Sequence, residues 1–440
     1  MRPGGRLAAA IEVLADIETR RRPAADALRD WGLSHRFAGS GDRAAIGNLV
    51  YDALRWRASS AWSMGNDSPR ALALSAFRRG WVSDVAEINA AIEADAHAPD
   101  QLSDDEQVRL TNIAVDGLAD APDWVRGDYP EWLQAEFSGL FGNAASEEGA
   151  ALSRRAPLDL RVNLLRASHE KAVKALARYS PQPVPLLPTG LRIPAGQGPQ
   201  RLPNIAAEAA YQRGHVEIQD AASQLAAILS GATGAMQVGD VCTGGGGKAL
   251  ALAALMGNRG QIHAYDADRN RLAPIFDRIK RAGARNIQVH APKAGLSEDL
   301  SGLIGKLDLV FVDAPCTGSG VWRRRPDAKW RLSPESLAKR QQEQDTILRA
   351  AAPLVKPGGR IVYATCSIMP AENDRRIETF LQDHSQFSIL PVEDVVAATL
   401  GAADGPAFLE SVHLCAHGLT MTPLKTGTDG FYVSALRRRG

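Results

Sequence analysis

The chain has few cysteines, no long apolar run and no excess of either charge, and each shortage excludes a class of protein. Its four cysteines among 440 residues form no Cys-x-x-Cys pair, so neither a disulfide scaffold nor a metal site is expected. The longest apolar run, Ala249 to Met256, is too short to span a bilayer, and the first residues lack the apolar core of a signal peptide. Lys and Arg total 51 against 50 Asp and Glu, so any nucleic-acid site must come from a local basic patch. We expect a monomeric cytoplasmic protein with no membrane partner.

The length predicts two or three globular domains, and the sequence pattern suggests where they divide. Residues 1–145 carry apolar residues at helical spacing and six of the eight tryptophans, which predicts an all-helical domain. Residues 150–210 combine a strand over 158–163, a helix over 169–177 and a proline-rich stretch, which predicts a small α/β subdomain.

Strands and helices alternate through residues 211–440, which predicts a doubly wound, mostly parallel sheet. Such sheets bind ligands beyond the carboxyl ends of their strands. The expected strands are 237–241, 261–265, 286–289, 307–312 and 360–364, with helices over 248–256 and 270–282.

A run of four glycines, Gly244–Gly247, follows the first of these strands and precedes Lys248. Glycines there let a ligand approach the backbone closely, and Asp266, at the end of the next strand, can accept both hydrogen bonds of a ribose diol. The lysine is not followed by Ser or Thr, so the loop is not a P-loop. The pattern suits NAD, a nucleotide or S-adenosylmethionine.

Two further strands end in cysteine-bearing loops, at Asp313-Ala314-Pro315-Cys316 and at Thr365-Cys366. Neighbouring parallel strands place their ends at one edge of a sheet, so Cys316, Cys366 and Asp313 are expected to converge. This set suits methylation of a pyrimidine at carbon 5, because a thiolate that adds to carbon 6 makes carbon 5 nucleophilic. A carboxylic acid near ring nitrogen 3 would stabilise the developing charge. Which of the two thiols attacks stays open at this point.

These motifs resemble those of the NOL/NOP/Sun family of RNA 5-methylcytosine methyltransferases. The resemblance is carried by Asp313–Gly320, by Thr365-Cys366-Ser367 with Glu372-Asn373, by Arg324–Asp327 and by Gly427–Tyr432. The N-terminal segment is similar to a NusB-like RNA-binding domain, as in the bacterial Sun branch, which acts on 16S ribosomal RNA. The likeness implies a class I, Rossmann-like methyltransferase domain over residues 211–440.

The resemblance also implies roles for individual residues. Cys366 would be the nucleophile, Cys316 would assist product release, and Asp313 would line the cytosine and methyl-donor pocket. S-adenosylmethionine would be the cofactor, and the residues expected to bind it are Cys242, Thr243, Gly244, Gly245, Gly246, Gly247, Lys248, Asp266, Arg271 and Asp313.

A basic, aromatic-rich segment follows the Cys316 motif. Basic side chains suit phosphates and tryptophans can stack on unpaired bases, so RNA contacts are expected from this segment. The candidates are Arg323, Arg324, Arg325 and Lys329. Ribosomal RNA is the expected substrate. Transfer RNA, a DNA cytosine substrate and a non-catalytic RNA-binding assembly factor on the same scaffold are the alternatives.

Overall fold

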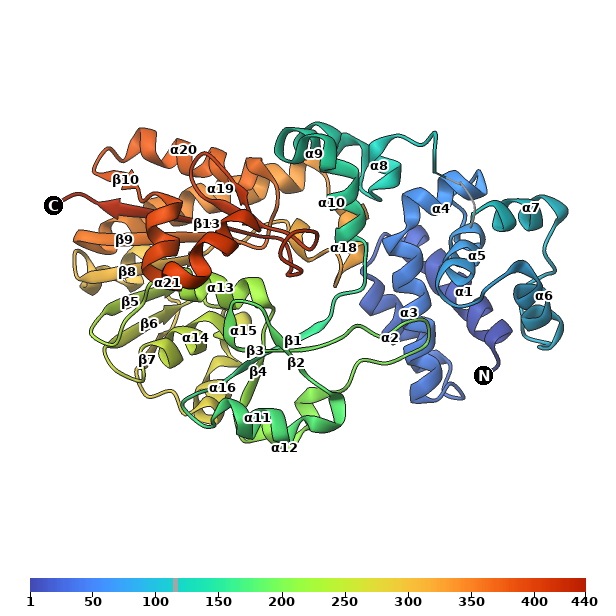
Figure 1. Ribbon diagram of the computed structural model, residues 1–440, viewed down its shortest axis with the longest axis horizontal. Helices are drawn as coiled ribbons and strands as arrows, with labels where there is room; N and C mark the ends of the chain where they lie inside the picture. Colours follow the sequence, from blue (N-terminus) through green and yellow to red (C-terminus); the bar gives the residue numbers. More distant parts are fainter. Residues whose placement is uncertain (114–117) are drawn as a thin grey trace. The chain divides into compact units, whose positions relative to one another are not determined.

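The computed structural model describes residues 1–113 and 118–440, which divide into two compact units (Figure 1). The helical unit comprises Met1–Ala156 together with two short segments from later in the chain, Ala195–Leu202 and Val321–Leu332. The α/β unit contains the remaining residues. Two segments that lie within the α/β half of the sequence therefore fold with the helices instead.

The first seven helices of the helical unit pack around one apolar core. Helix α1 shows the reason, because Leu7, Leu14 and Ile17 recur on one face and are buried there. Its α-helices are α1 (Pro3–Arg20), α2 (Ala24–Ser34), α3 (Ser40–Arg55), α4 (Arg57–Met64), α5 (Pro69–Gly80), α6 (Val85–Glu93), α7 (Asp104–Asn112), α8 (Asp123–Arg126), α9 (Gln134–Phe141), α10 (Ala145–Leu152) and α18 (Pro326–Arg331).

A small antiparallel sheet opens the α/β unit, with strand order β2-β3-β1-β4. Its strands are β1 (Leu158–Val162), β2 (Gln182–Val184), β3 (Leu187–Ile193) and β4 (Val216–Ile218), accompanied by helices α11 (His169–Ala175) and α12 (Ala209–Gln212). The predicted boundary at residue 210 falls before β4, which pairs with β1 and completes this sheet. The prolines of the connector lie largely in and around the edge hairpin β2–β3.

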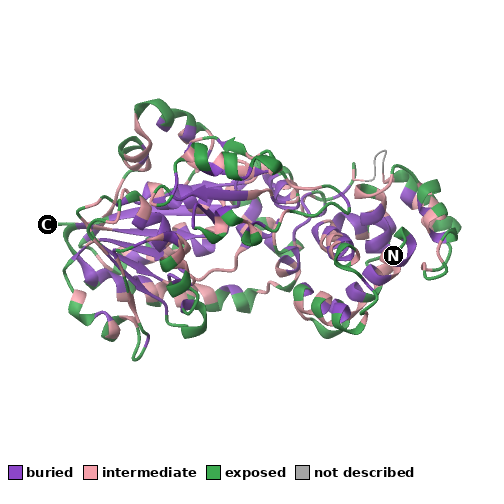
Figure 2. Ribbon diagram, turned by 90° about the horizontal axis from the view of Figure 1, so that it is seen from below, coloured by how far each residue is buried: buried purple, intermediate pink, exposed green. Residues whose placement is uncertain are grey.

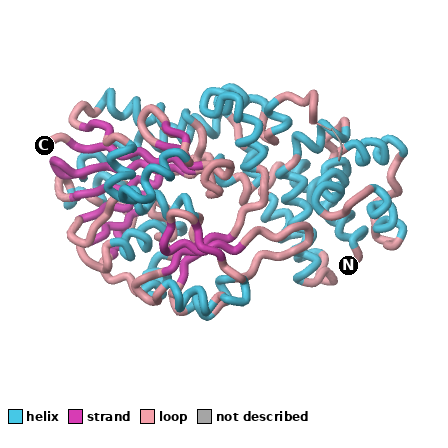
Figure 3. Tube along the Cα trace, viewed as in Figure 1, coloured by secondary structure: helices cyan, strands magenta, loops and turns pink. Residues whose placement is uncertain are grey.

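The large sheet has the order β11-β12-β13-β9-β8-β5-β6-β7, with β10 also paired to β13 (Figure 3). Strands β9, β8, β5, β6 and β7 are parallel and β13 runs antiparallel to β9, which confirms the predicted mixed, mostly parallel sheet. The bounds are β5 (Gln237–Val241), β6 (Gln261–Tyr265), β7 (Ile287–His290), β8 (Leu307–Asp313), β9 (Val355–Thr365), β10 (Phe387–Ile389), β11 (His413–Leu414), β12 (Leu419–Met421) and β13 (Phe431–Arg438).

Helices cover both faces of the large sheet, and its strands are the most continuously buried part of the unit (Figure 2). Strand β8 shows how the sequence does this: Leu309 and Phe311 pack on one face, and Val310 and Val312 on the other. The helices are α13 (Ala221–Leu229), α14 (Gly247–Leu255), α15 (Arg269–Leu272), α16 (Ile275–Ala282), α17 (Leu296–Asp299), α19 (Pro334–Ala351), α20 (Asp374–Asp383) and α21 (Val392–Glu410).

The helix predicted over residues 270–282 is wrong, because the structure divides this segment into two helices. The pattern over 270–282 predicts a single helix, whereas the structure has α15 and α16 with Pro274 between them. Proline lacks the backbone N–H that a continuous helix needs there. In the described part of the chain, no helix combines the length and apolarity needed to cross a bilayer.

Candidate functional site

The two cysteine-bearing loops meet at the carboxyl edge of the large sheet. Strands β8 and β9 pair in parallel with Asp313 opposite Ala364, so the loop Asp313–Gly320 (the Cys316 loop) and the loop Thr365–Asn373 (the Cys366 loop) start side by side. The Sγ atoms of Cys316 and Cys366 lie 3.3 Å apart. The thiols are free and half-buried, so the predicted convergence of both cysteines is what the structure shows.

A fully buried carboxylate, Glu372, joins the two loops. Its Oε1 accepts hydrogen bonds from the Thr317 backbone N–H at 2.8 Å and from Gln344 Nε2 at 3.1 Å. Its Oε2 accepts from the hydroxyls of Thr317 at 2.6 Å and Ser367 at 2.5 Å. Thr317 and Ser367 each adjoin a cysteine, so this Glu372 cluster (Thr317, Gln344, Ser367 and Glu372) fixes the spacing of the thiols.

The backbone of the two loops is also in direct contact. The Gly320 N–H donates to the Cys366 carbonyl at 3.0 Å, and the Gly430 N–H donates to the Gly320 carbonyl at 2.8 Å. A Cβ at Gly320 would lie 2.0 Å from the Gly430 carbonyl oxygen. The residue must therefore be glycine for the chain to pass here.

The surroundings of Cys316 favour its protonated form. The hydrogen bond to Cys366, together with burial and the nearby Glu372 charge, raises the pKa of Cys316 well above its usual value. Cys316 therefore remains a thiol at neutral pH and can donate its S–H to the Cys366 sulfur. Burial also raises the pKa of the other two cysteines, Cys242 and Cys415, the latter to about 11, and neither lies in this pair.

A partly buried ion pair lies beside the cysteines. The Lys248 ammonium donates to Asp313 Oδ2 at 2.6 Å and lies 5.0 Å from the Phe431 ring centre. Burial opposes the charge on Lys248, but the Asp313 carboxylate and, more weakly, Cys366 raise its pKa, so it stays protonated. The Lys248 ammonium therefore places a permanent positive charge near the cysteine pair.

The loop between β5 and α14, Cys242–Gly246 (the glycine loop), is shaped by its backbone. Cys242, Gly244 and Gly246 have φ angles of +63°, +52° and +82°. A Cβ at Gly246 would lie 2.5 Å from Ile275 Cγ1. Both this close contact and the positive φ angle therefore require glycine at this position. Thr243 supports the turn from within, since its hydroxyl donates to Asp240 Oδ2 at 2.6 Å.

The groups around this loop fit S-adenosylmethionine. Asp266 accepts the Gly244 N–H on Oδ2 at 2.8 Å and the Asp268 N–H on Oδ1 at 2.9 Å. A carboxylate offers about four acceptor positions, which leaves two for a ribose diol. Arg271 lies 3.8 Å from the same Oδ2. Asp240 Oδ1 is buried and has no partner among the described residues, so a hydrogen-bond acceptor is available behind the loop.

Two of the four expected RNA contacts need correction. Lys329 is 1% exposed and donates to the Arg55 carbonyl at 3.0 Å and to Ser153 Oγ at 2.9 Å, within the helical unit. Arg323 is 4% exposed in the same unit. Arg324 is half-buried and Arg325 exposed. The aromatic residues of the segment are also in use, because Trp322 is buried and Trp330 Nε1 donates to the Leu54 carbonyl at 2.6 Å.

Sequence reasoning missed some residues that shape the site. Glu372 entered the sequence analysis only as part of the motif around Cys366. The sequence does not indicate that Gln344 and Thr317 hydrogen-bond to the same carboxylate. Asp240 is detectable in the sequence as an acid between Gly239 and Val241 near the end of a predicted strand. Burial raises its pKa to about 7.

Comparison with known proteins agrees with this geometry. Family models described as "16S rRNA methyltransferase RsmB/F" and "Methyltr_RsmF/B-like, ferredoxin-like domain" match residues 227–437 and 129–197. A probable ribosomal RNA small subunit methyltransferase B from Synechocystis is 32% identical over 317 residues, covering 70% of this chain and 67% of that one. A protein of the same description from Bacillus subtilis is 31% identical over 321 residues, covering 71% and 67%.

Solved structures share the fold. The crystal structure of PH0851 aligns with a TM-score of 0.71 at 23% identity, over 100% of this chain and 99% of that one. NSun6 from Pyrococcus horikoshii, solved with SFG, aligns with a TM-score of 0.59 at 20% identity, over 71% and 98%. Both alignments support the predicted Rossmann-like methyltransferase fold.

Proposed function

We propose that this chain, which belongs to the 16S rRNA methyltransferase RsmB/F family, forms 5-methylcytosine in small-subunit ribosomal RNA through a covalent bond to Cys366. That it is an RNA methyltransferase follows from its family, and the family implies S-adenosylmethionine as the cofactor. The choice of carbon 5 and of the covalent route is the proposal. It rests on one observation, the Cys316–Cys366 pair with its sulfurs 3.3 Å apart.

The reaction needs a nucleophile because carbon 5 of cytosine is unreactive in the intact ring. The Cys366 thiolate forms a bond to carbon 6, and the ring electrons move to carbon 5. Bound S-adenosylmethionine supplies an electrophilic methyl group, and the residues that would bind it are those of the glycine loop with Asp266. Loss of the carbon 5 proton to water then restores the double bond and breaks the bond between carbon 6 and sulfur.

Cys316 acts on the leaving sulfur. Because its pKa is raised by Cys366 and by burial, it keeps its proton and donates its S–H to the Cys366 sulfur. That hydrogen bond stabilises the thiolate that departs from carbon 6. The Lys248 ammonium adds a positive charge to the same neighbourhood and holds the Asp313 carboxylate in an ion pair.

The decisive experiment measures methyl transfer from labelled S-adenosylmethionine to unmodified small-subunit ribosomal RNA and to transfer RNA. Wild type is expected to place the label in 5-methylcytosine of the ribosomal RNA. Cys366→Ala is expected to reduce transfer by at least about 10⁴-fold, as removal of a nucleophile does. Cys316→Ala is expected to accumulate a protein–RNA adduct that survives denaturing electrophoresis.

Each other result changes the assignment. Label in transfer RNA alone would replace the substrate, and label on another atom of the base would replace the chemistry. An adduct that forms in Cys366→Ala but not in Cys316→Ala would exchange the roles of the two thiols. RNA binding without any transfer by wild type would favour the non-catalytic assembly factor.

A further inference from the structure

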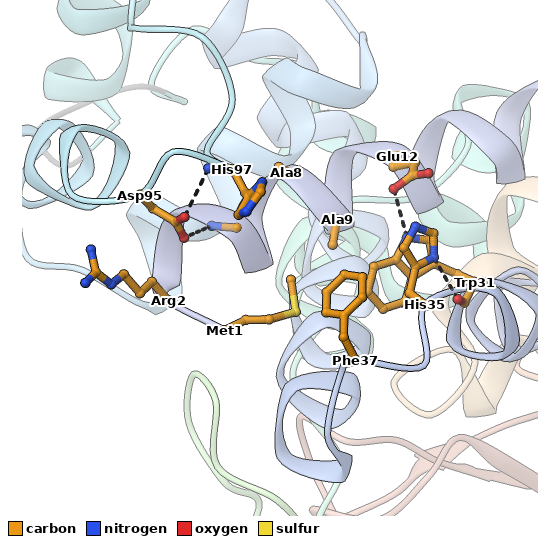
Figure 4. Close-up of a pocket in the computed structure, with 11 residues that line it drawn as sticks. Met1, Arg2, Ala8, Ala9, Glu12, Trp31, His35, Phe37, Asp95 and His97 are labelled. Atoms are coloured by element: carbon orange, nitrogen blue, oxygen red, sulfur yellow. Dashed lines mark hydrogen bonds between the residues drawn. The ribbon is translucent and has the colours of Figure 1, made fainter.

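Two cavities in the helical unit differ in whether their polar groups are already paired. One, of about 730 Å³, lies beside α1 and α2 and is walled by Trp31, His35 and Phe37 (Figure 4). Several of its polar groups are already paired: Trp31 Nε1 donates to Glu12 at 2.8 Å, the Met1 ammonium donates to Asp42 at 3.0 Å, and Asp95 accepts the His97 N–H at 3.1 Å.

The second cavity, of about 250 Å³, is strongly basic. Helix α3 forms one wall, and the two inserted segments, Ala195–Leu202 and Val321–Leu332, form part of the others. All of its lining belongs to the helical unit. The lining residues are Asn48, Tyr51, Arg55, Arg155, Ala156, Ala195, Gly196, Gln200, Leu202, Arg323 and Arg324.

Two of these arginines share a single buried carboxylate. Asp52 is 1% exposed, and its Oδ1 accepts from Arg55 Nη1 at 3.1 Å and from Arg155 Nε at 2.9 Å. Its Oδ2 accepts from Arg155 Nη2 at 2.5 Å. Two guanidinium groups against one carboxylate leave one positive charge in excess beside the cavity. A buried excess charge is costly unless an opposite charge meets it.

One of the arginines also has an unused donor. Arg55 is 8% exposed, and its Nε–H is buried with no hydrogen-bond partner among the described residues. Burial lowers the pKa of Arg55, and Arg155 lowers it further, although the Asp52 carboxylate opposes both. An unpaired donor on a buried cation is the feature that an oxyanion would satisfy.

We propose that this cavity binds a phosphate group of the RNA substrate, held by Arg55, Arg155 and Arg324, with the Tyr51 ring beside it for the adjoining nucleotide. The assignment to RNA rests on the proposed function. It is favoured over a free anion because Arg324, one of the lining residues, follows Cys316 by only eight residues in the sequence. Arginine matches phosphate by its planar set of donors.

The test measures RNA affinity without S-adenosylmethionine, so that failure of the catalytic proposal cannot affect the result. A fluorescent single-stranded RNA nonamer is titrated into wild type, Arg155→Gln and Arg324→Gln at several salt concentrations. The control is Arg29→Gln, an arginine of α2 with a side chain 63% exposed and outside the cavity. Both cavity variants are expected to raise Kd about tenfold and to lower the salt slope by about one, while the control matches wild type.

A second arm adds inorganic phosphate at constant ionic strength and measures the thermal midpoint. Unchanged RNA affinity in the folded variants, with phosphate stabilising only wild type, would assign the cavity to a free anion and overturn the RNA assignment. No response to either probe would overturn the site altogether. Arg155 also donates to the Gly196 and Gly198 carbonyls, so if its variant fails to fold, the half-buried Arg324 decides the outcome.

Discussion

Two consecutive stretches of this chain, the Cys316 loop and Val321–Leu332, follow one another without a break yet belong to different units. The first places a thiol, held through Thr317 and Glu372, at the edge of the large sheet. The second contributes Trp322 and Lys329 to the interior of the helical unit. The change happens between Gly320 and Val321.

The comparison teaches that polarity along a sequence does not by itself identify a surface. Lys329 and Arg323 have the residue types of an RNA contact, and they are buried. Glu372 has the residue type of a solvated acid, and it is fully buried at the site. In both cases, whether the polar side chain is buried depends on the number of hydrogen-bond partners that distant parts of the chain supply.

Among variants that keep both cysteines, the largest effect is expected at Glu372, which holds the Cys316 loop in place. The Glu372 carboxylate accepts hydrogen bonds from Thr317, Gln344 and Ser367, so Glu372→Gln turns an amide NH₂ toward other donors. We expect about a hundredfold loss of methyl transfer, because the thiols are displaced, and about 3 kcal/mol lower unfolding free energy. Affinity for S-adenosylmethionine should stay unchanged in calorimetric titration.

The matched control for this variant is Glu378→Gln, on the exposed face of α20. Equal rates for the two variants would mean that the Glu372 cluster only fills space. A parallel loss of cofactor affinity in Glu372→Gln would mean that the cysteine loops and the glycine loop form one cooperative element.

A smaller effect is expected in the glycine loop, whose shape depends on its backbone, whereas the cysteine loops are held by the side chains of the Glu372 cluster. Gly246→Ala introduces a Cβ 2.5 Å from Ile275 Cγ1 at a φ of +82°, whereas at Gly245 the nearest atom is Arg278 Nη1, at 3.2 Å. The left-handed conformation costs alanine about 1–2 kcal/mol, so S-adenosylmethionine should bind about tenfold more weakly to Gly246→Ala. Gly245→Ala is the control. Similar affinities for both variants would show that the loop adapts.

The sequence predicts the large sheet well because each strand carries its own apolar pattern. The predicted strands 237–241 and 261–265 match β5 and β6 residue for residue. Parallel pairing then brings the ends of β8 and β9 together, so the meeting of Cys316 with Cys366 also follows from local pattern and topology.

The features that the sequence did not predict depend on hydrogen bonds between residues that are far apart in the chain. The segment after Gly320 looks like an exposed basic loop until its partners are known: Arg55 and Ser153, which accept from Lys329, lie far away in the chain. The Glu372 cluster likewise needs Gln344, which is 28 residues away. Such contacts come from tertiary packing, which composition does not record.

The smallest effect is expected in the pH dependence of unfolding free energy, and it comes from Lys329 in the segment Val321–Leu332. Catalysis should be unaffected. Burial lowers the pKa of Lys329 to about 7, although Asp128 opposes this and Arg55 reinforces it. Between pH 7 and 10 the unfolded chain carries the proton that the folded chain lacks, so this group makes unfolding free energy rise by about 1.4 kcal/mol per pH unit. Lys329→Met should remove that slope in urea titrations, whereas Lys339→Met, an exposed change in α19, should retain it. Identical slopes in wild type and Lys329→Met would mean that the amine reaches solvent, and the RNA role of this residue would then return.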